Sequence, residues 1–135
     1  MLETLNIKTF QRVDFIEVTS DIEKFIEKNE IEDGICCLFV PHTTAALTIN
    51  ENADPSVKND IKIKINSLLP YKDSYTHSEG NSDAHIKSSI FGPSLSLIID
   101  AGRLVLGAWQ GVYFCEFDGP RNRRLVIKII PDKNP

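Results

Sequence analysis

The chain has 135 residues, of which 41% are hydrophobic and 25% are charged, and its formal net charge at pH 7 is -4. This size and composition fit one compact domain, 1–135, with a sizeable core. The negative charge argues against a nucleic-acid partner bound through phosphate neutralisation. Apolar runs such as 35–40 are too short to cross a bilayer, and the N-terminus lacks the features of a signal peptide. We therefore expect a cytoplasmic protein with no membrane partner.

The first part of the chain is predicted to hold two strands and a helix. Residues 2–10 and 13–18 have the composition of strands. A helix is predicted to begin near Ser20, because residues 20–23 have the Ser-x-x-Glu pattern of a capping box, and to end near Asn29. Its apolar stripe consists of Ile22, Phe25 and Ile26.

The middle of the chain is predicted to contain two strands and two helices. Asp54 followed by Pro55 is a favoured N-cap and first helical residue, and Pro70 ends the helical spacing that follows. The predicted elements are strands over 35–40 and 45–50, a helix over 54–69, a loop over 71–81, and a short helix over 82–91.

The last third is predicted to be rich in β-structure, which gives an α+β fold in which helices lie on antiparallel sheets. Residues 118–122 have the composition of a hairpin turn. The predicted strands cover 94–99, 104–118 (as one strand, or as two joined at Gly107 or Gly111) and 123–130.

Both faces of the predicted strand 104–118 are largely apolar. A strand with one face in water alternates apolar with polar residues, so each face of this strand needs a cover. A second copy of the chain is one candidate, and a sandwich that covers both faces by itself is the other.

All three histidines, His42, His77 and His85, lie in polar stretches of the first two thirds of the chain. Three neutral imidazoles are enough to hold a catalytic zinc-type ion with one position open for water. Their spacing matches no standard metal motif, so three unrelated histidines are the alternative.

The helix predicted at Ser82 offers a place for an anion. Its first-turn N–H groups have no partner within the helix, and its N-terminus carries partial positive charge. Gly80 and Asn81 lead into it, and His85 lies in its first turn, so a metal on His85 would neighbour an anion. The alternative is that Ser82 only caps the helix and that His85 is solvated.

Two other groups of polar residues are candidates. Glu51 lies in a run of amides and carboxylates, and it is a candidate general base acting through a metal-bound water. Turn and cap chemistry explains Asp54 in that run well but Glu51 poorly. Arg121 and Arg123 present planar forks suited to phosphate, or they form salt bridges across the 118–122 turn.

Three long blocks of the chain resemble the YjbQ family. They cover nearly the whole chain in order, with Ala108 standing where a threonine is expected. The blocks are Pro41-His42-Thr43-Thr44-Ala45-Ala46-Leu47 running on to Pro55, His77-Ser78-Glu79-Gly80-Asn81-Ser82-Asp83-Ala84-His85, and Gly102 to Gly111 running on to Glu116-Phe117-Asp118-Gly119-Pro120-Arg121.

The resemblance implies an α+β fold with antiparallel, β-sandwich-like sheets and two to three helices, assembled as a homotrimer. It also implies a divalent metal ion, expected to be zinc, on His42, His77 and His85. It further implies a weak secondary thiamine-phosphate synthase activity. That reaction joins a hydroxymethylpyrimidine diphosphate to a thiazole phosphate and releases pyrophosphate.

Two classes of function follow. The first is a metal-assisted transferase that acts on a phosphorylated small molecule, with metal-assisted phosphate hydrolysis as a variant. The second is a non-catalytic trimer that binds a metal or a small anion. A site of three histidines with no fourth protein ligand favours the enzyme. In the enzyme, Glu51 or Asp83 moves a proton, and phosphate is bound by Asn81, Ser82, Arg121 and Arg123.

Overall fold

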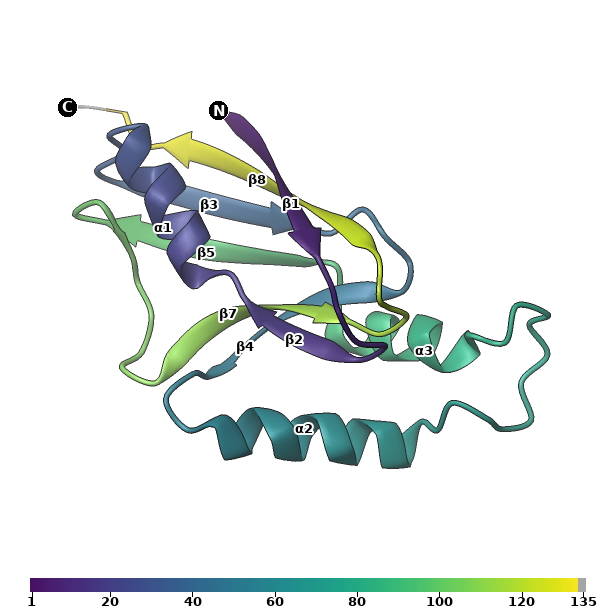
Figure 1. Ribbon diagram of the computed structural model, residues 1–135. Coiled ribbons are helices and arrows are strands. Elements are labelled where there is room, and N and C mark those ends of the chain that lie inside the picture. Colours follow the sequence, from purple (N-terminus) through teal and green to yellow (C-terminus); the bar gives the residue numbers. More distant parts are fainter. Residues whose placement is uncertain (134–135) are drawn as a thin grey trace.

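The computed structural model describes residues 1–133 and contains two antiparallel sheets and three helices, which confirms the predicted α+β class (Figure 1). One sheet has five strands in the order β1-β8-β3-β5-β6, and the other has three in the order β2-β7-β4. The strands are β1 (Leu2–Lys8), β2 (Asp14–Glu17), β3 (Gly34–Phe39), β4 (Ala45–Glu51), β5 (Ser94–Asp100), β6 (Arg103–Leu104), β7 (Gln110–Glu116) and β8 (Asn122–Pro131). The helices are α1 (Thr19–Lys28), α2 (Pro55–Leu68) and α3 (Ser82–Phe91).

The main core joins the five-stranded sheet, the inner face of the three-stranded sheet and α1. Along β8, apolar residues at every second position point inward, which is the period-two pattern of a strand with one buried face. Each fully buried aliphatic side chain of this kind contributes about 1.5 to 3 kcal/mol. The core includes Ile22 and Ile26 of α1, Leu38 of β3, Phe114 of β7, and Leu125 and Ile127 of β8.

Strand β7 is covered on both faces by its own chain. Val112 and Phe114 point into the main core, whereas Tyr113 and Cys115 belong to a second apolar cluster that includes Ala84 of α3. Figure 1 shows α2 and α3 beside the three-stranded sheet, on the side away from the five-stranded sheet. A sandwich with its own helices, rather than a partner, therefore explains why this strand is apolar on both sides.

The predicted capping box at Ser20 does not form. Helix α1 begins at Thr19, and its N-cap is Val18, with no side-chain cap hydrogen bond. Val18 is buried, and its N–H donates to the carbonyl oxygen of Val112 at 2.9 Å. This bond fixes the chain at the start of the helix and leaves Ser20 exposed. The predicted cap of α2 does form, since Asp54 accepts the N–H of Ser56 at 2.9 Å.

The predicted hairpin at residues 118–122 is also wrong, because β7 and β8 lie in different sheets. The turn, which contains a cis peptide bond between Gly119 and Pro120, carries the chain from the three-stranded sheet to the five-stranded one. The predicted strand 104–118 is divided into β6 and β7, with residues 105–109 between them. None of the helices within residues 1–133 is long and apolar enough to cross a membrane.

A buried ion pair ties the two sheets together at this turn. Arg123 of β8 donates from Nε to Oε1 of Glu116 on β7 at 2.8 Å, and from Nη2 to Oε2 of the same carboxylate. Thr9, just after β1, donates to Glu116 Oε1 at 2.8 Å. Burial raises the pKa of Glu116, but the hydrogen bonds from Arg123, the Asp118 amide and Thr9 outweigh it and leave the pKa lowered.

We expect Glu116→Gln to lower the free energy of unfolding by about 3 kcal/mol, because it leaves a buried guanidinium without its counter-charge. Urea unfolding at pH 7 measures this value. The exposed Glu27→Gln serves as the control, and it is expected to change stability by no more than about 0.5 kcal/mol.

The difference between wild type and Glu116→Gln should depend on pH. A carboxylate whose pKa is lowered on folding stabilises the native state fully above its ordinary value of 4.5. That stability is lost as the pH falls through the lower folded value. The wild-type advantage should therefore shrink below pH 4.5. An advantage that stays constant down to complete acid unfolding would contradict this account.

Candidate functional site

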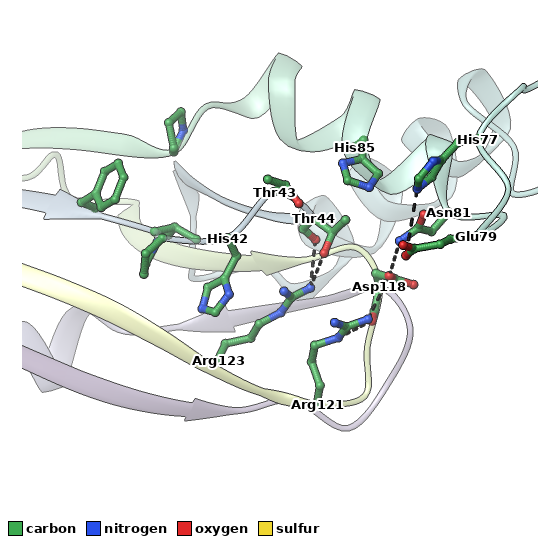
Figure 2. A pocket seen from close by; sticks show the side chains of 14 residues that line it. His42, Thr43, Thr44, His77, Glu79, Asn81, His85, Asp118, Arg121 and Arg123 are labelled. Atoms are coloured by element: carbon green, nitrogen blue, oxygen red, sulfur yellow. Dashed lines mark hydrogen bonds and ion pairs between the residues drawn. The ribbon is translucent and has the colours of Figure 1, made fainter.

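A pocket of about 700 Å³ opens where the end of β3, the start of α3 and the β7–β8 turn meet (Figure 2). It gathers most of the residues predicted from the sequence as ligands and phosphate binders. Ser82 lines a neighbouring cavity instead. The polar residues around the pocket are His42, Thr43, Thr44, His77, Glu79, Asn81, His85, Asp118, Arg121 and Arg123.

Two of the three histidines lie against each other on one wall. The rings of His77 and His85 have centroids 5.3 Å apart and are perpendicular, with an interplanar angle of 90°. His77 Nε2 lies 4.0 Å from Oε2 of Glu79. Figure 2 shows both imidazoles at the start of α3, with Glu79 beside His77. Two imidazoles and a carboxylate are donors that suit a divalent transition-metal ion.

His42 lies apart from this pair, next to β8. Its Nε2 accepts the backbone N–H of Arg124 at 2.9 Å. The pKa of His42 is lowered, first by burial and then by the positive charges of Arg123 and Arg124. The imidazole is therefore neutral at pH 7, and the hydrogen bond to Nε2 assigns its proton to Nδ1. In this conformation His42 offers the pocket a hydrogen-bond donor.

The three histidines share the pocket but do not meet at one point. Within residues 1–133, no group of three or more His, Cys, Asp or Glu side chains is arranged to hold a metal ion. His77, His85 and Glu79 have the right chemistry for such an ion. His42 can act as the third imidazole ligand through Nε2 only if its hydrogen bond with Arg124 is broken.

Arg121 is the exposed cation of the pocket, with 48% of its side chain accessible. It donates from Nε to the carbonyl oxygen of Asp118 and from Nη2 to Asp118 Oδ2, both at 2.9 Å. Asn81, the N-cap of α3, donates from Nδ2 to the same Asp118 oxygen at 2.8 Å and makes no side-chain cap bond to the helix. The other side-chain atom of Asn81, Oδ1, is buried and has no hydrogen-bond partner in the described part of the chain.

Arg123 has a different position from Arg121. Its side chain is buried by the ion pair with Glu116, and Nη2 also donates to Oγ1 of Thr44 at 2.7 Å. Its charge is therefore engaged within the fold. Of the two arginines predicted to bind phosphate, Arg121 is the one available to a ligand.

The two carboxylates predicted to move a proton do not line the pocket. Asp83 is fully buried, and it accepts both Nη atoms of Arg12 and Nζ of Lys87, each at 2.9 Å. Burial raises the pKa of Asp83, but the hydrogen bonds from Arg12 and Lys87 outweigh it, and the pKa is lowered. Glu51 ends β4, the strand that leads away from the pocket, about 20 Å from its first residue at ~3.3 Å per residue.

The carboxylates that line the pocket are Glu79 and Asp118. Neither was predicted to have a catalytic or substrate-binding role. The available signal was the position of both residues inside the blocks that resemble a known family.

His42 should titrate below its ordinary pKa of 6.5 in metal-free protein. Arg124→Gln keeps the backbone N–H but removes one charge that lowers this pKa, so it should move the midpoint upward. Lys128→Gln, farther along the same strand, should leave it unchanged. Imidazole ¹⁵N and ¹³C–H shifts followed against pH measure the midpoint and the tautomer. A midpoint above 6.5, or a proton on Nε2, would contradict this geometry.

The sequence is similar to known proteins over almost its full length. The model of the family described as UPF0047 protein YjbQ-like matches residues 3–132. A UPF0047 protein of Methanocaldococcus jannaschii is 52% identical over 133 residues, which cover 98% of this chain and 96% of that protein. The UPF0047 protein YugU of Bacillus subtilis is 48% identical over 131 residues, covering 96% of this chain and 99% of the relative.

Solved structures agree with the fold described above. A YjbQ/UPF0047 family protein from Clostridium acetobutylicum has a TM-score of 0.92 at 47% identity, covering 95% of this chain and 99% of that one. A protein from Sulfolobus solfataricus P2, described as YbjQ-like and of unknown function, also has a TM-score of 0.92, at 30% identity. That match covers 98% of this chain and 97% of the Sulfolobus chain.

Proposed function

The chain belongs to the UPF0047 YjbQ-like family, and we propose that its pocket binds a phosphorylated small molecule and acts on it as a weak, metal-assisted transferase of the secondary thiamine-phosphate synthase type. One observation carries the proposal. A single open pocket combines an exposed arginine, a neutral histidine and a facing pair of imidazoles at the start of a helix.

Phosphate recognition falls to Arg121 and the start of α3. Arg121 is half exposed, and a guanidinium fork matches phosphate oxygens. The ten-residue helix α3 begins beside it, and its N-cap Asn81 lines the pocket without a side-chain cap bond to the helix. The helix dipole at this end favours an anion. Both substrates of the proposed reaction carry phosphate, so the exposed guanidinium of Arg121 and the positive end of the helix suit each of them.

Two other residues orient the rest of the ligand. The buried Oδ1 of Asn81 needs a donor, which a ligand N–H or O–H group would supply. His42, on the opposite wall, carries its single proton on Nδ1, because the imidazole is neutral and its Nε2 accepts the Arg124 N–H. The site therefore offers donors to phosphate and an acceptor to an amino or hydroxyl group.

We propose that a divalent ion, expected to be zinc, binds His77 and His85, with Glu79 as the nearest carboxylate. When bound, such an ion neutralises charge on a leaving diphosphate. We propose the set His42, His77 and His85 as the complete group of ligands. Binding through His42 requires that the hydrogen bond from the Arg124 N–H to His42 Nε2 is broken.

Metal content separates the two ligand sets. We expect about one ion per chain by plasma emission on untagged protein. His77→Ala and His85→Ala should lose it, and His42→Ala should retain it if the imidazole pair is the core of the site. Loss in all three variants would establish the three-histidine set. No ion after reconstitution with zinc, nickel, manganese or iron would remove the metal from the proposal.

Arg121→Ala should weaken binding of the phosphorylated substrate by about ten- to a hundredfold, since a hydrogen bond to a charged group contributes roughly 1.5 to 3 kcal/mol. Pyrophosphate release from hydroxymethylpyrimidine diphosphate and thiazole phosphate measures turnover. The exposed Arg103→Ala, outside the pocket, is the control. Release of inorganic phosphate from simple phosphate esters instead would identify a hydrolase. Binding without any turnover would identify a non-catalytic binding protein.

We also propose a homotrimer, and the outer face of the five-stranded sheet is the surface that supports it. Ile35 pairs in register with Ile98 of β5 on one side and Ile130 of β8 on the other, and all three are exposed. A row of isoleucines across three strands is an apolar patch that a second copy would cover. Phe39 lies on the same face and also lines the pocket, so a copy bound here would border the site.

Ile98→Asp is expected to convert the trimer to monomers, because it places a charge in that row, beside Ile35. Ile63→Asp on α2 is the matched control, since both isoleucines are 61% exposed. Light scattering at micromolar concentration gives the mass. A wild-type mass of one chain would contradict the trimer, and dissociation by Ile63→Asp alone would move the interface to α2.

A further inference from the structure

We infer that the chain has a second anion-binding site, at a cavity of about 510 Å³ between α2, α3 and the connection from β1 to β2. This cavity shares no lining residue with the histidine pocket. The residues that carry the inference are Gln11, Arg12, Lys62, Asn66, Tyr71 and Lys87. The inference does not depend on the proposed function.

The first observation is a buried lysine at the base of the cavity. The Lys87 side chain is 1% exposed, yet it lines this open space. Its ammonium donates to Oδ1 of Asn66 at 2.8 Å and to Oδ2 of Asp83 at 2.9 Å. An ammonium has three donors, so one proton is left for a ligand in the cavity.

The second observation is an excess of positive charge. Arg12 and Lys87 both bind the single buried carboxylate of Asp83. The next carboxylate, Asp118, lies 3.9 Å from Arg12 but forms a closer pair with Arg121 at 2.9 Å. Counting Arg121, this cluster has three cations and two carboxylates, so it carries one net positive charge. A bound anion would balance that charge.

The rest of the lining also consists mainly of donors. Lys62 on α2 reaches Oε1 of Gln11 at a long 3.4 Å, so most of its hydrogen-bonding capacity is available. The carbonyl oxygens of Gln11 and Asn66 accept from the two lysines, which leaves both amide NH₂ groups as donors. The guanidinium of Arg12 lies over the Tyr71 ring, with its Cζ 3.6 Å from the ring centroid.

Cations and amide donors around one small cavity fit a compact oxyanion with more than one negative charge. The ligand class that meets this description is inorganic phosphate or the phosphate group of a small molecule. Lys62 is the residue to test, because it lies on the exposed helix α2 and takes no part in the Asp83 cluster.

The test is a titration of the whole protein with inorganic phosphate at constant ionic strength, followed by ¹H–¹⁵N NMR. Two separate groups of shifts are expected, one around Gln11, Lys62 and Tyr71 and one around Thr43, His85 and Arg121. Lys62→Glu should weaken phosphate at the first group by about tenfold and leave the second unchanged. Arg121→Ala should do the reverse.

Lys64→Glu is the control, since it places the same charge change on an exposed residue of α2 outside the cavity. Equal effects of Lys62→Glu and Lys64→Glu would mean that phosphate responds only to overall charge, and would overturn the second site. Shifts confined to the Arg121 group would overturn it as well. Shifts confined to the Lys62 group would support it while removing phosphate binding from the proposed function.

Discussion

The buried ion pair between Glu116 and Arg123 determines how the two sheets meet. Its members lie on β7 and β8, which belong to different sheets, and it also takes up Thr9 after β1 and Thr44 before β4. Four segments that are far apart in the sequence are thus held at one place. Buried pairs add little net stability but penalise alternative arrangements, because any other alignment of the sheets leaves a charge unpaired.

The same pair supports the pocket. Arg123 holds Thr44, and the two residues before Thr44 form one wall of the site. Close approach at the turn adds a second constraint, since a Cβ on Gly119 would lie 2.3 Å from the carbonyl oxygen of Gln11 and 2.8 Å from Cγ of Glu116. The 118–122 turn can therefore approach the ion pair only with glycine at position 119. The position of this turn also determines the position of Arg121.

Local patterns predicted local structure well and long-range partners poorly. The Asp54 cap and the period-two burial of β8 follow from neighbouring residues, and both were predictable. The 118–122 turn was also recognisable, but turn residues do not reveal whether the two strands that they join pair with each other. Helix α1 starts within one residue of the predicted Ser20, but its cap was not predictable for the same reason, because the N-cap Val18 is held by a bond to Val112, far along the chain.

The site shows the same division. The segments that line the pocket lie in the blocks similar to a known family, so the residues of the pocket could be predicted from the sequence. The sequence did not show which of these side chains are free to contact a ligand. Asp83 points into the protein because it accepts hydrogen bonds from Arg12, and Arg123 is buried because it pairs with Glu116. Both of these partners are brought into place by the tertiary fold. His42 differs from the other two histidines because a backbone N–H of β8 occupies its Nε2.

The place of β8 in the larger sheet has a consequence for synthesis of the protein on the ribosome. β8 is the last strand in chain order, yet it lies between β1 and β3 and pairs with both (Figure 1). β1 therefore has no neighbour in its sheet until residues 122–131 have been made. Closure of this sheet requires contacts between distant parts of the sequence, which form slowly. Until the final strand emerges, the apolar side chains and unpaired backbone groups of β1 are therefore exposed to aggregation in the nascent chain.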